Sequence, residues 1–267
     1  MKTEAGKWGD LRLRLISAAV MAVVAGVDIW LGGPWFLALL ALISAGMVWE
    51  AARLGGALRG PLRDVALPVA GGAAVIGAEW ISVPLGFVLL GVVASAVWAL
   101  ASRLRHRLAL YAFFCMTAGL ALYGIRDLFG IVVLIWVIGV VIASDVMGYF
   151  AGRVLGGPKF WPKVSPKKTW SGTVAGWAGA ALLGGLMGDR LLAGGLDWPL
   201  SPVFFSVILA FAAQMGDIVE SALKRKAGIK DSSHLIPGHG GVLDRFDGMI
   251  GAALVFFPVL TVAGLLV

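Results

Sequence analysis

Long apolar runs recur along this chain and constrain its fold more than any other feature. A helix needs about 20 mostly apolar residues to cross the hydrocarbon core of a bilayer. The composition agrees, because 60% of the 267 residues are hydrophobic and only 14% are charged, whereas soluble domains carry about 25% charged residues. The sequence therefore predicts an all-α, polytopic integral membrane bundle. Nine spans are expected, over residues 13–31, 35–53, 65–83, 85–102, 108–124, 128–148, 172–192, 202–222 and 247–267.

No linker or soluble segment interrupts these runs, so we expect a single membrane-embedded domain over residues 1–267. A nucleic-acid partner is not expected, because no segment is polar enough to form a soluble basic face. The single cysteine, Cys115, lies in an apolar run and excludes a disulfide framework, and the three histidines are too scattered for a zinc site.

Basic residues set the predicted orientation, because they favour cytoplasmic loops. With the N-terminus inside, all but two of the 22 Lys and Arg residues fall in cytoplasmic segments, the exceptions being Arg126 and Arg190. The sequence thus predicts a cytoplasmic N-terminus and an external C-terminus. It also places loops 153–171 and 223–246 on the same, cytoplasmic side.

The seventh apolar run carries a small residue at every fourth position. Such a stripe lets two helices approach closely, and we expect it to pack tightly against a neighbour. Its members are Gly172, Gly176, Ala180, Gly184 and Gly188.

Acidic residues mark the ends of the eighth and ninth runs. Asp217 lies near the cytoplasmic end of the eighth run, and Asp244 and Asp247 lie at the start of the ninth. An acid in a membrane span is costly and is therefore a functional candidate, and carboxylates without His or Cys partners suit Mg²⁺ rather than zinc. In the alternative interpretations, Asp217 and Glu220 pair with a lysine at a helix end, and Asp244 stabilises a helix start.

The two cytoplasmic loops carry groups that suit a polyphosphate. In loop 153–171, prolines keep the chain non-helical up to the seventh span, and Ser165-Pro-Lys-Lys-Thr169 leads into that helix. Backbone N–H groups, hydroxyls and ammonium groups would converge there on phosphates. In loop 223–246, Pro237–Gly241 exposes backbone N–H groups. The alternative role of the cations is anchoring to anionic lipid headgroups. Asp145 is expected either to join the metal site or to pair with a lysine, and Glu50 is interpreted as structural.

Residues 221–247, SALKRKAGIKDSSHLIPGHGGVLDRFD, closely resemble the signature of the phosphatidate cytidylyltransferase (CDP-diacylglycerol synthase) family. Residues 145–153 and 165–170 look like the same family, and residues 12–18 are similar too. Two positions depart from the family pattern: Ser171 stands where an acid is usual, and Gly248 where a serine is common.

The resemblance implies an all-helical membrane enzyme that transfers CMP from CTP to phosphatidate, giving CDP-diacylglycerol and pyrophosphate for phospholipid biosynthesis. It implies Mg²⁺, alone or with a second metal or a monovalent cation, and a homodimer in a bacterial-type inner membrane with its site facing the cytosol. The N-terminal helices would then cover about 13–124 and the catalytic part about 128–267.

The site residues expected from this combination fall into three groups. The metal ligands are Asp217, Asp244 and Asp247; the catalytic residues are Lys224, Arg225, Asp244 and Asp247; and the substrate-binding residues are Asp145, Ser165, Lys167, Lys168, Thr169, Ser221, Lys230, Asp231, His239, Gly240, Gly241 and Arg245.

Two other functions remain open at this point. A CTP-dependent polyprenol or phytol kinase would direct an alcohol to the γ-phosphorus and release CDP instead of pyrophosphate. An ion transporter would use the buried acids as its path, but it leaves the Lys-Lys-Thr and Gly-His-Gly-Gly loops without a role.

Overall fold

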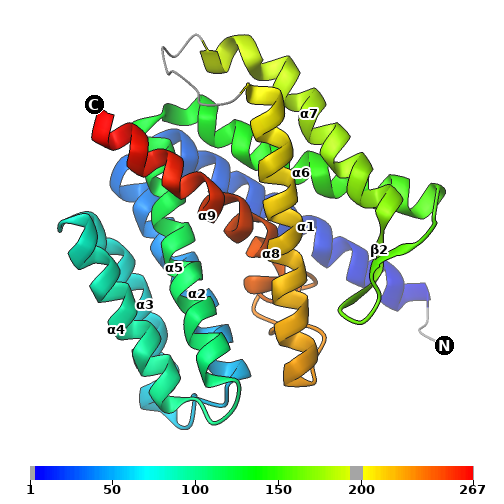
Figure 1. Cartoon of the computed structure of the whole chain (residues 1–267). Coiled ribbons are helices and arrows are strands. Elements are labelled where there is room, and N and C mark those ends of the chain that lie inside the picture. The colour runs from blue at the N-terminus through cyan, green and yellow to red at the C-terminus, as the bar shows by residue number, and fades with distance from the viewer. Residues whose placement is uncertain (1–3, 193–200, 267) are drawn as a thin grey trace. The chain divides into compact units, whose positions relative to one another are not determined.

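The computed structural model describes residues 4–192 and 201–266 (Figure 1). Over these residues the chain forms nine α-helices and two short strands. In chain order they are α1 (Glu4–Leu31), α2 (Gly33–Leu54), α3 (Pro61–Glu79), α4 (Val83–Leu100), α5 (Arg105–Leu128), α6 (Gly130–Val154), β1 (Lys159–Trp161), β2 (Ser165–Thr169), α7 (Trp170–Leu192), α8 (Pro202–Ala227) and α9 (Leu243–Leu266).

Each predicted apolar run coincides with one helix to within a few residues, which confirms the all-α class. Within the described residues, six helices are long and apolar enough to cross a membrane, namely α1, α2, α4, α5, α6 and α8. These helices indicate that the chain is an integral membrane protein. The count of nine spans stays a prediction, since α3 begins with the charged residues Arg63 and Asp64, and α7 is rich in glycine.

Loop 153–171 contains a β-hairpin that the sequence analysis missed. Strands β1 and β2 pair antiparallel, with Lys159 opposite Thr169 and Trp161 opposite Ser165. The prolines that exclude helix are compatible with short edge strands, where a missing N–H is tolerated. Helix α7 follows β2 directly: the Thr169 hydroxyl accepts a hydrogen bond from the Gly172 N–H at 3.2 Å, as a helix-capping residue does.

The chain divides into two compact units, which are described separately. The first contains residues 1–120 and 226–246, and the second contains residues 121–225 and 247–267. Segment 226–246 groups with the N-terminal helices in the first unit. The predicted division into N-terminal helices and a catalytic part stays a prediction.

Helix α2 supplies much of the core of the first unit. Val48, Ala51 and Ala52 are completely buried, and the neighbouring helix α3 approaches closely because Gly71 leaves room for the Val48 side chain. Glu50 lies among these apolar residues and is also completely buried. An acid in such surroundings requires polar partners.

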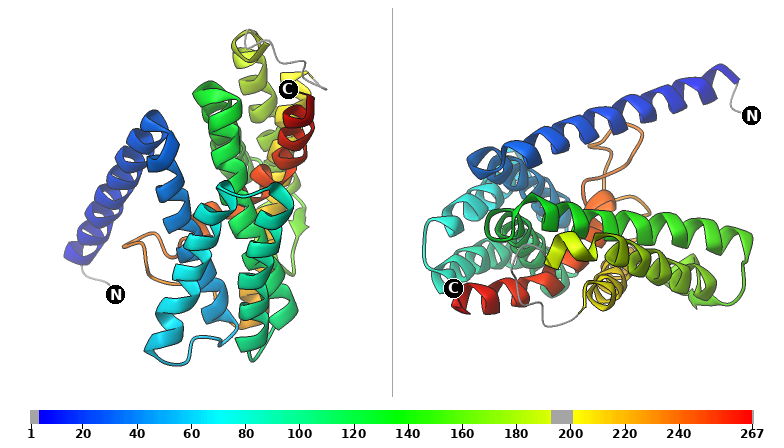
Figure 2. Two further views of the ribbon diagram at one scale, coloured as in Figure 1. Left: turned by 90° about the vertical axis from the view of Figure 1, so that its left-hand side faces the viewer. Right: turned by 90° about the horizontal axis from the view of Figure 1, so that it is seen from above.

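Helices α6 and α7 run side by side in the second unit (Figures 1 and 2). The predicted small-residue stripe forms part of this contact: Gly172 lies against Gly148, and a side chain at Gly176 would collide with Ser144. Further along, Gly184 lies against Ser206 of α8. The predicted tight packing is confirmed at these positions but not at Gly188, where an added Cβ would meet nothing within 4 Å.

An aromatic cluster packs α6, α8 and α9 against one another in the second unit. The rings of Trp136, Phe205 and Phe256 pack on one another with centroids 5.5–6.3 Å apart. The Trp136 indole N–H donates to the Ser206 hydroxyl at 2.9 Å, and this hydroxyl donates to the Pro202 carbonyl at 2.7 Å. The polar atoms of the cluster are thus paired inside the apolar core.

The stripe yields a matched pair of variants. Gly176→Val should lower the free energy of unfolding by about 1–3 kcal/mol, because the new side chain overpacks a closed contact. Gly188→Val, on the same helix, should change it by less than about 0.5 kcal/mol. Thermal unfolding of the purified proteins in detergent measures both. Equal shifts for the two variants would contradict the close contact at Gly176.

Candidate functional site

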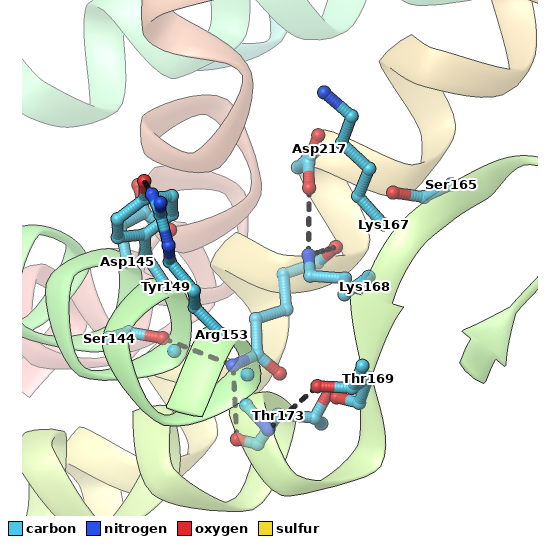
Figure 3. A pocket seen from close by; sticks show the side chains of 14 residues that line it. Ser144, Asp145, Tyr149, Arg153, Ser165, Lys167, Lys168, Thr169, Thr173 and Asp217 are labelled. Carbon is cyan, nitrogen blue, oxygen red and sulfur yellow. Dashed lines mark hydrogen bonds and ion pairs between the residues drawn. The ribbon is translucent and has the colours of Figure 1, made fainter. Parts of the chain in front are cut away.

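A pocket of about 490 Å³ opens in the second unit among β2, α6, α7 and α8 (Figure 3). Its size lies within the range of small-ligand pockets, about 300–1,000 Å³. Predicted site residues from three separate stretches of sequence meet in it. These are Asp145, Ser165, Lys167, Lys168, Thr169 and Asp217.

An ion pair joins two of these residues. The Lys168 ammonium on β2 lies 2.8 Å from Asp217 Oδ2 on α8, and it also donates to the Gln214 carbonyl at 3.3 Å. Asp217 Oδ1 accepts from the Ser221 hydroxyl at 3.4 Å, one helical turn further on. Because the Asp217 side chain is 36% exposed, its carboxylate remains accessible to a ligand in the pocket.

Arg153 and Tyr149 add a cation and a phenol to the pocket lining. The guanidinium donates to the Tyr149 hydroxyl at 2.7 Å and lies 6.0 Å from the centre of its ring. Gly148 and Gly152, on the same helix as Asp145, also line the pocket. Neither Arg153 nor Tyr149 was predicted as a site residue, although both stand in the family-like stretch 145–153.

Gln214 is a further residue that the sequence analysis missed. Its amide is buried and donates to the Ser144 hydroxyl of α6 and the Thr173 carbonyl of α7, both at 3.2 Å. The Trp177 indole N–H donates to its carbonyl oxygen at 3.0 Å. Gln214 thus joins three helices one turn before Asp217 and fixes the part of α8 that carries the acid. Its polar side chain in an apolar run was the available signal.

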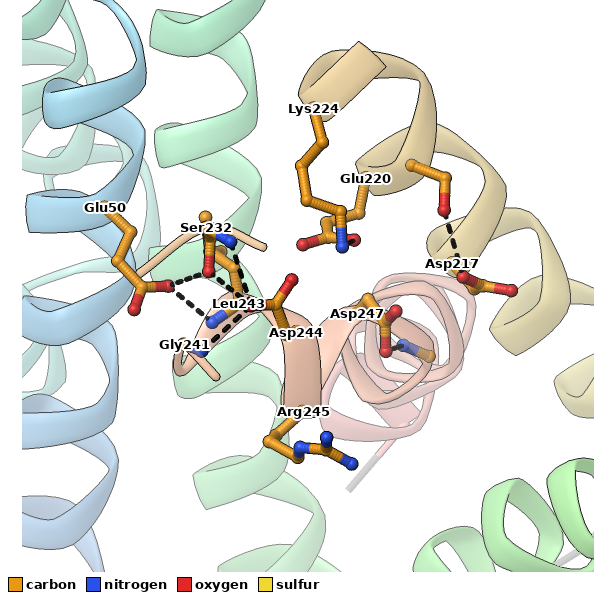
Figure 4. Close-up of polar contacts among 12 residues, drawn as sticks. Glu50, Asp217, Glu220, Lys224, Ser232, Gly241, Leu243, Asp244, Arg245 and Asp247 are labelled. Carbon is orange, nitrogen blue, oxygen red and sulfur yellow. Dashed lines mark hydrogen bonds and ion pairs between the residues drawn. The ribbon is translucent and has the colours of Figure 1, made fainter. Parts of the chain in front are cut away.

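The predicted catalytic residue Lys224 forms an ion pair with Glu220, one turn earlier on α8 (Figure 4). The Glu220 side chain is only 1% exposed and that of Lys224 is 11% exposed. This pair matches the alternative interpretation offered for Glu220, in which an acid and a lysine close a helix end. Arg225, the next residue, is exposed. Whether Lys224 and Arg225 are catalytic stays a prediction.

Asp247 lies on α9 where that helix meets α8. A side chain at Gly216 would collide with the Asp247 carbonyl, so the two backbones are in close contact beside Asp217. The Asp247 carboxylate accepts from the Gly248 N–H at 2.7 Å. At Gly248 an added Cβ would lie 3.3 Å from Val141, so a serine would be crowded at this departure from the family pattern.

Ser171, the other departure, has a defined structural role. Its hydroxyl donates to the Gly156 carbonyl and lies 3.0 Å from the Thr169 hydroxyl. The residue therefore connects the start of α7 to the segment that follows α6. The Thr169 hydroxyl serves the same helix start, and its predicted contact with substrate stays a prediction.

Across the described residues, no three Asp, Glu, His or Cys side chains gather closely enough to hold a metal ion. Asp217 and Asp247 belong to the second unit and Asp244 to the first. The donor type of Asp217 nevertheless fits Mg²⁺, which commonly binds one or two protein carboxylates and completes its shell with water and substrate phosphates. The three-acid metal site stays a prediction.

In the first unit, Asp244 organises the loop that precedes α9. Its Oδ2 accepts from the backbone N–H groups of Ser232 at 2.9 Å and Gly241 at 2.8 Å. The Ser232 hydroxyl lies 2.9 Å from the same oxygen. These bonds fit the alternative interpretation, in which Asp244 stabilises a helix start. They also hold its carboxylate in one orientation.

The glycine-rich bend of this loop contacts α1, as Figure 2 shows in both views. The Ser17 hydroxyl donates to the Pro237 carbonyl at 3.0 Å and lies 2.8 Å from His239 Nδ1. Gly238 and Gly240 adopt positive φ angles of 75° and 88°, which only glycine adopts without strain.

Other predicted residues of this loop differ in their surroundings. The Arg245 guanidinium donates twice to the His239 carbonyl, at 2.9 and 2.8 Å, so it supports the bend. Lys230 and Asp231 are exposed. None of these contacts tests the predicted binding of substrate.

Comparison with known proteins assigns the family. A model described as the cytidylyltransferase family matches residues 12–263. The phosphatidate cytidylyltransferase of Brucella abortus biovar 1 (strain 9-941) is 34% identical over 253 residues, covering 93% of this chain and 92% of the relative. That of Helicobacter pylori (strain ATCC 700392 / 26695) is 48% identical over 134 residues, 50% of this chain and 49% of the relative. The chain therefore belongs to the cytidylyltransferase family of nucleotidyltransferase enzymes.

Proposed function

We propose that this protein is a phosphatidate cytidylyltransferase, which transfers CMP from CTP to phosphatidate and releases pyrophosphate. The observation that carries the proposal is the pocket of the second unit, where Arg153, Lys167 and Lys168 accompany the carboxylates of Asp145 and Asp217. Three cations in one cavity match the charge of a polyphosphate. The full-length similarity to a protein named for this activity supports the same substrate pair.

The chemistry requires little beyond positioning and charge neutralisation. The nucleophile is a phosphate oxygen of phosphatidate, and a phosphomonoester has a second pKa of about 6. It is therefore largely dianionic at neutral pH, and no general base has to remove a proton. This oxygen forms a bond to the α-phosphorus of CTP, while the bond from that phosphorus to the β-phosphate oxygen breaks and pyrophosphate leaves. The described residues that line the pocket include no histidine.

The side chains of the pocket have distinct parts in this proposal. Lys167 and Lys168 neutralise the phosphate oxygens of CTP and the charge that develops on pyrophosphate. Lys168, which is held at 2.8 Å by Asp217 in the present structure, exchanges this partner for phosphate. Arg153 is placed to orient a second phosphate through its planar donor group.

Magnesium would supply further charge neutralisation and alignment of the triphosphate when bound. Asp217 and Asp247 are the candidate ligands that the second unit offers, and the assignment of Asp244 as a further ligand rests on sequence alone. We also propose that the site faces the cytosol, because CTP is cytosolic and the basic loops favour that side. The predicted homodimer and inner-membrane location complete this proposal.

The first test is product analysis with labelled CTP and phosphatidate on the purified protein. The wild type should form lipid-linked CMP and pyrophosphate. Asp217→Asn should lower kcat by at least about 100-fold, because the cation that Asp217 would hold against the phosphates loses its carboxylate ligand. Asp127→Asn, at an exposed position at the end of α5, is the control and should retain turnover. Release of CDP in place of pyrophosphate would indicate a lipid kinase instead.

The second test concerns the hairpin lysines. Removal of a charge-assisted hydrogen bond costs about 1.5–3 kcal/mol, so Lys167→Gln and Lys168→Gln should each reduce kcat/KM for CTP by about 10–100-fold. Lys159→Gln on the partner strand serves as the control, since Lys159 is exposed and does not line the pocket. If all three variants lose activity equally, the effect comes from the hairpin as a whole and the assignment of the two pocket lysines fails.

The third test is metal removal. Treatment with a chelator should abolish turnover, and excess Mg²⁺ should restore it, while K⁺ alone should not. In Asp217→Asn, the Mg²⁺ concentration for half-maximal activity should rise by about 10-fold or more. Full turnover after exhaustive chelation would contradict the proposed metal dependence.

A further inference from the structure

Glu50 is a buried acid for which the sequence offered no function. It lies on α2, in the first unit, and its side chain is completely buried. Four hydrogen-bond donors converge on its carboxylate. Oε1 accepts from the Ser233 hydroxyl and the Val242 N–H, and Oε2 accepts from the Ser232 hydroxyl and the Leu243 N–H. Figure 4 shows the contacts with Ser232 and Leu243.

All four donors belong to one distant segment, 182–193 residues along the chain from Glu50. Two of them, the N–H groups of Val242 and Leu243, lie at 2.8 and 2.7 Å and stand at the start of α9. The first N–H groups of a helix have no partner within that helix. Glu50 therefore caps α9 from a different helix, and it bridges the two ends of loop 232–243.

Ser232 links this carboxylate to that of Asp244. Its hydroxyl oxygen lies 2.8 Å from Glu50 Oε2 and 2.9 Å from Asp244 Oδ2. The loop N–H groups of Ser232 and Gly241 donate to the same Asp244 oxygen. A shift of the loop away from Glu50 would therefore also move the donors that orient Asp244.

The packing at Gly241 provides an independent sign that this arrangement is closely fitted. A Cβ atom at Gly241 would collide with the Ser232 hydroxyl and lie 2.5 Å from Glu50 Oε1. Gly241 is not among the residues with positive φ, so the need for glycine here is one of space. Gly241 was predicted to bind substrate, and its close surroundings give a second reason for a glycine at this position.

We propose that Glu50 is a positioning residue: it holds loop 232–243 in a single conformation and, through Ser232, fixes the orientation of the Asp244 carboxylate that the reaction uses. The part played by Asp244 in turnover rests on the proposed function. The restraint of the loop by Glu50 does not rest on the proposed function, because it follows from the hydrogen bonds alone.

The geometry also predicts that neither glutamine nor aspartate can replace Glu50. A glutamine has one acceptor oxygen, so its NH₂ group would face the N–H of Val242 or Leu243 and leave a buried donor without an acceptor. An aspartate is shorter by one methylene and withdraws both oxygens from the loop. Either change should loosen the loop while leaving the apolar packing of α2 largely in place.

Hydrogen exchange of the full-length protein in detergent, without CTP or metal, tests the first half of the proposal. In Glu50→Gln, peptides covering residues 232–243 should exchange at least about 10-fold faster than in wild type, because the amides lose their acceptor. Peptides from α6 and α7 should be unchanged. Glu79→Gln, at an exposed position at the end of α3, makes the same chemical change and should exchange like wild type. Unchanged exchange in the loop of Glu50→Gln would overturn the inference.

Kinetics test the second half. Glu50→Gln should lower kcat by about 10–100-fold, the usual effect of removing a residue that orients a functional group, and change KM for CTP by less than about threefold. Ser232→Ala keeps both backbone amides on Glu50 and should fold even if Glu50→Gln does not. It should lower kcat with little change in loop exchange.

The outcomes separate the two proposals. A loosened loop with wild-type kcat overturns the positioning role, as does wild-type kcat in Ser232→Ala. If the wild type itself forms no product from CTP, the proposed function fails, and the exchange pattern alone then decides whether Glu50 holds the loop.

Discussion

Burial of carboxylates in a largely apolar chain is the constraint on which this structure depends. A charged group removed from water requires donors or a counter-ion supplied by the protein itself. Glu50 receives hydroxyl and amide donors from loop 232–243, whereas Glu220 is paired with Lys224. Asp217 pairs with Lys168 but stays partly exposed. The two completely enclosed acids thus support structure, and the accessible one lines the pocket.

The sequence predicted those features of the fold and site that depend on residues close together in the chain. Length and hydropathy located the nine helices of the described residues, because each apolar run is about as long as a membrane span. The small-residue stripe predicted the close contact of α7, which holds at Gly172, Gly176 and Gly184. Asp217 was selected because charge is costly in a membrane span, Lys168 because its loop carries groups that suit phosphates, and Asp145 as a possible partner of either, and the fold brings all three into one pocket. The candidate site was therefore found largely because its charged residues interrupt a mostly apolar sequence.

What the sequence did not predict depends on pairing between distant segments. The hairpin of β1 and β2 was missed because its strands have three and five residues and contain no alternating pattern. Gln214 was missed because its partners lie on two other helices. Glu50 was predicted to be structural, but its partners were not predicted. Two of its donors are backbone amides, which no side-chain motif in the sequence can indicate.

The crowding among Glu50, Ser232 and Gly241 has an evolutionary consequence. Any side chain at Gly241 would occupy the space of the other two, so a substitution at one of these positions is tolerated only with simultaneous adjustment at the others. Drift at the three sites should therefore be correlated, although one lies in α2 and two lie about 180 to 190 residues later. Engineering that transplants the glycine-rich loop between homologues would have to carry the second helix with it.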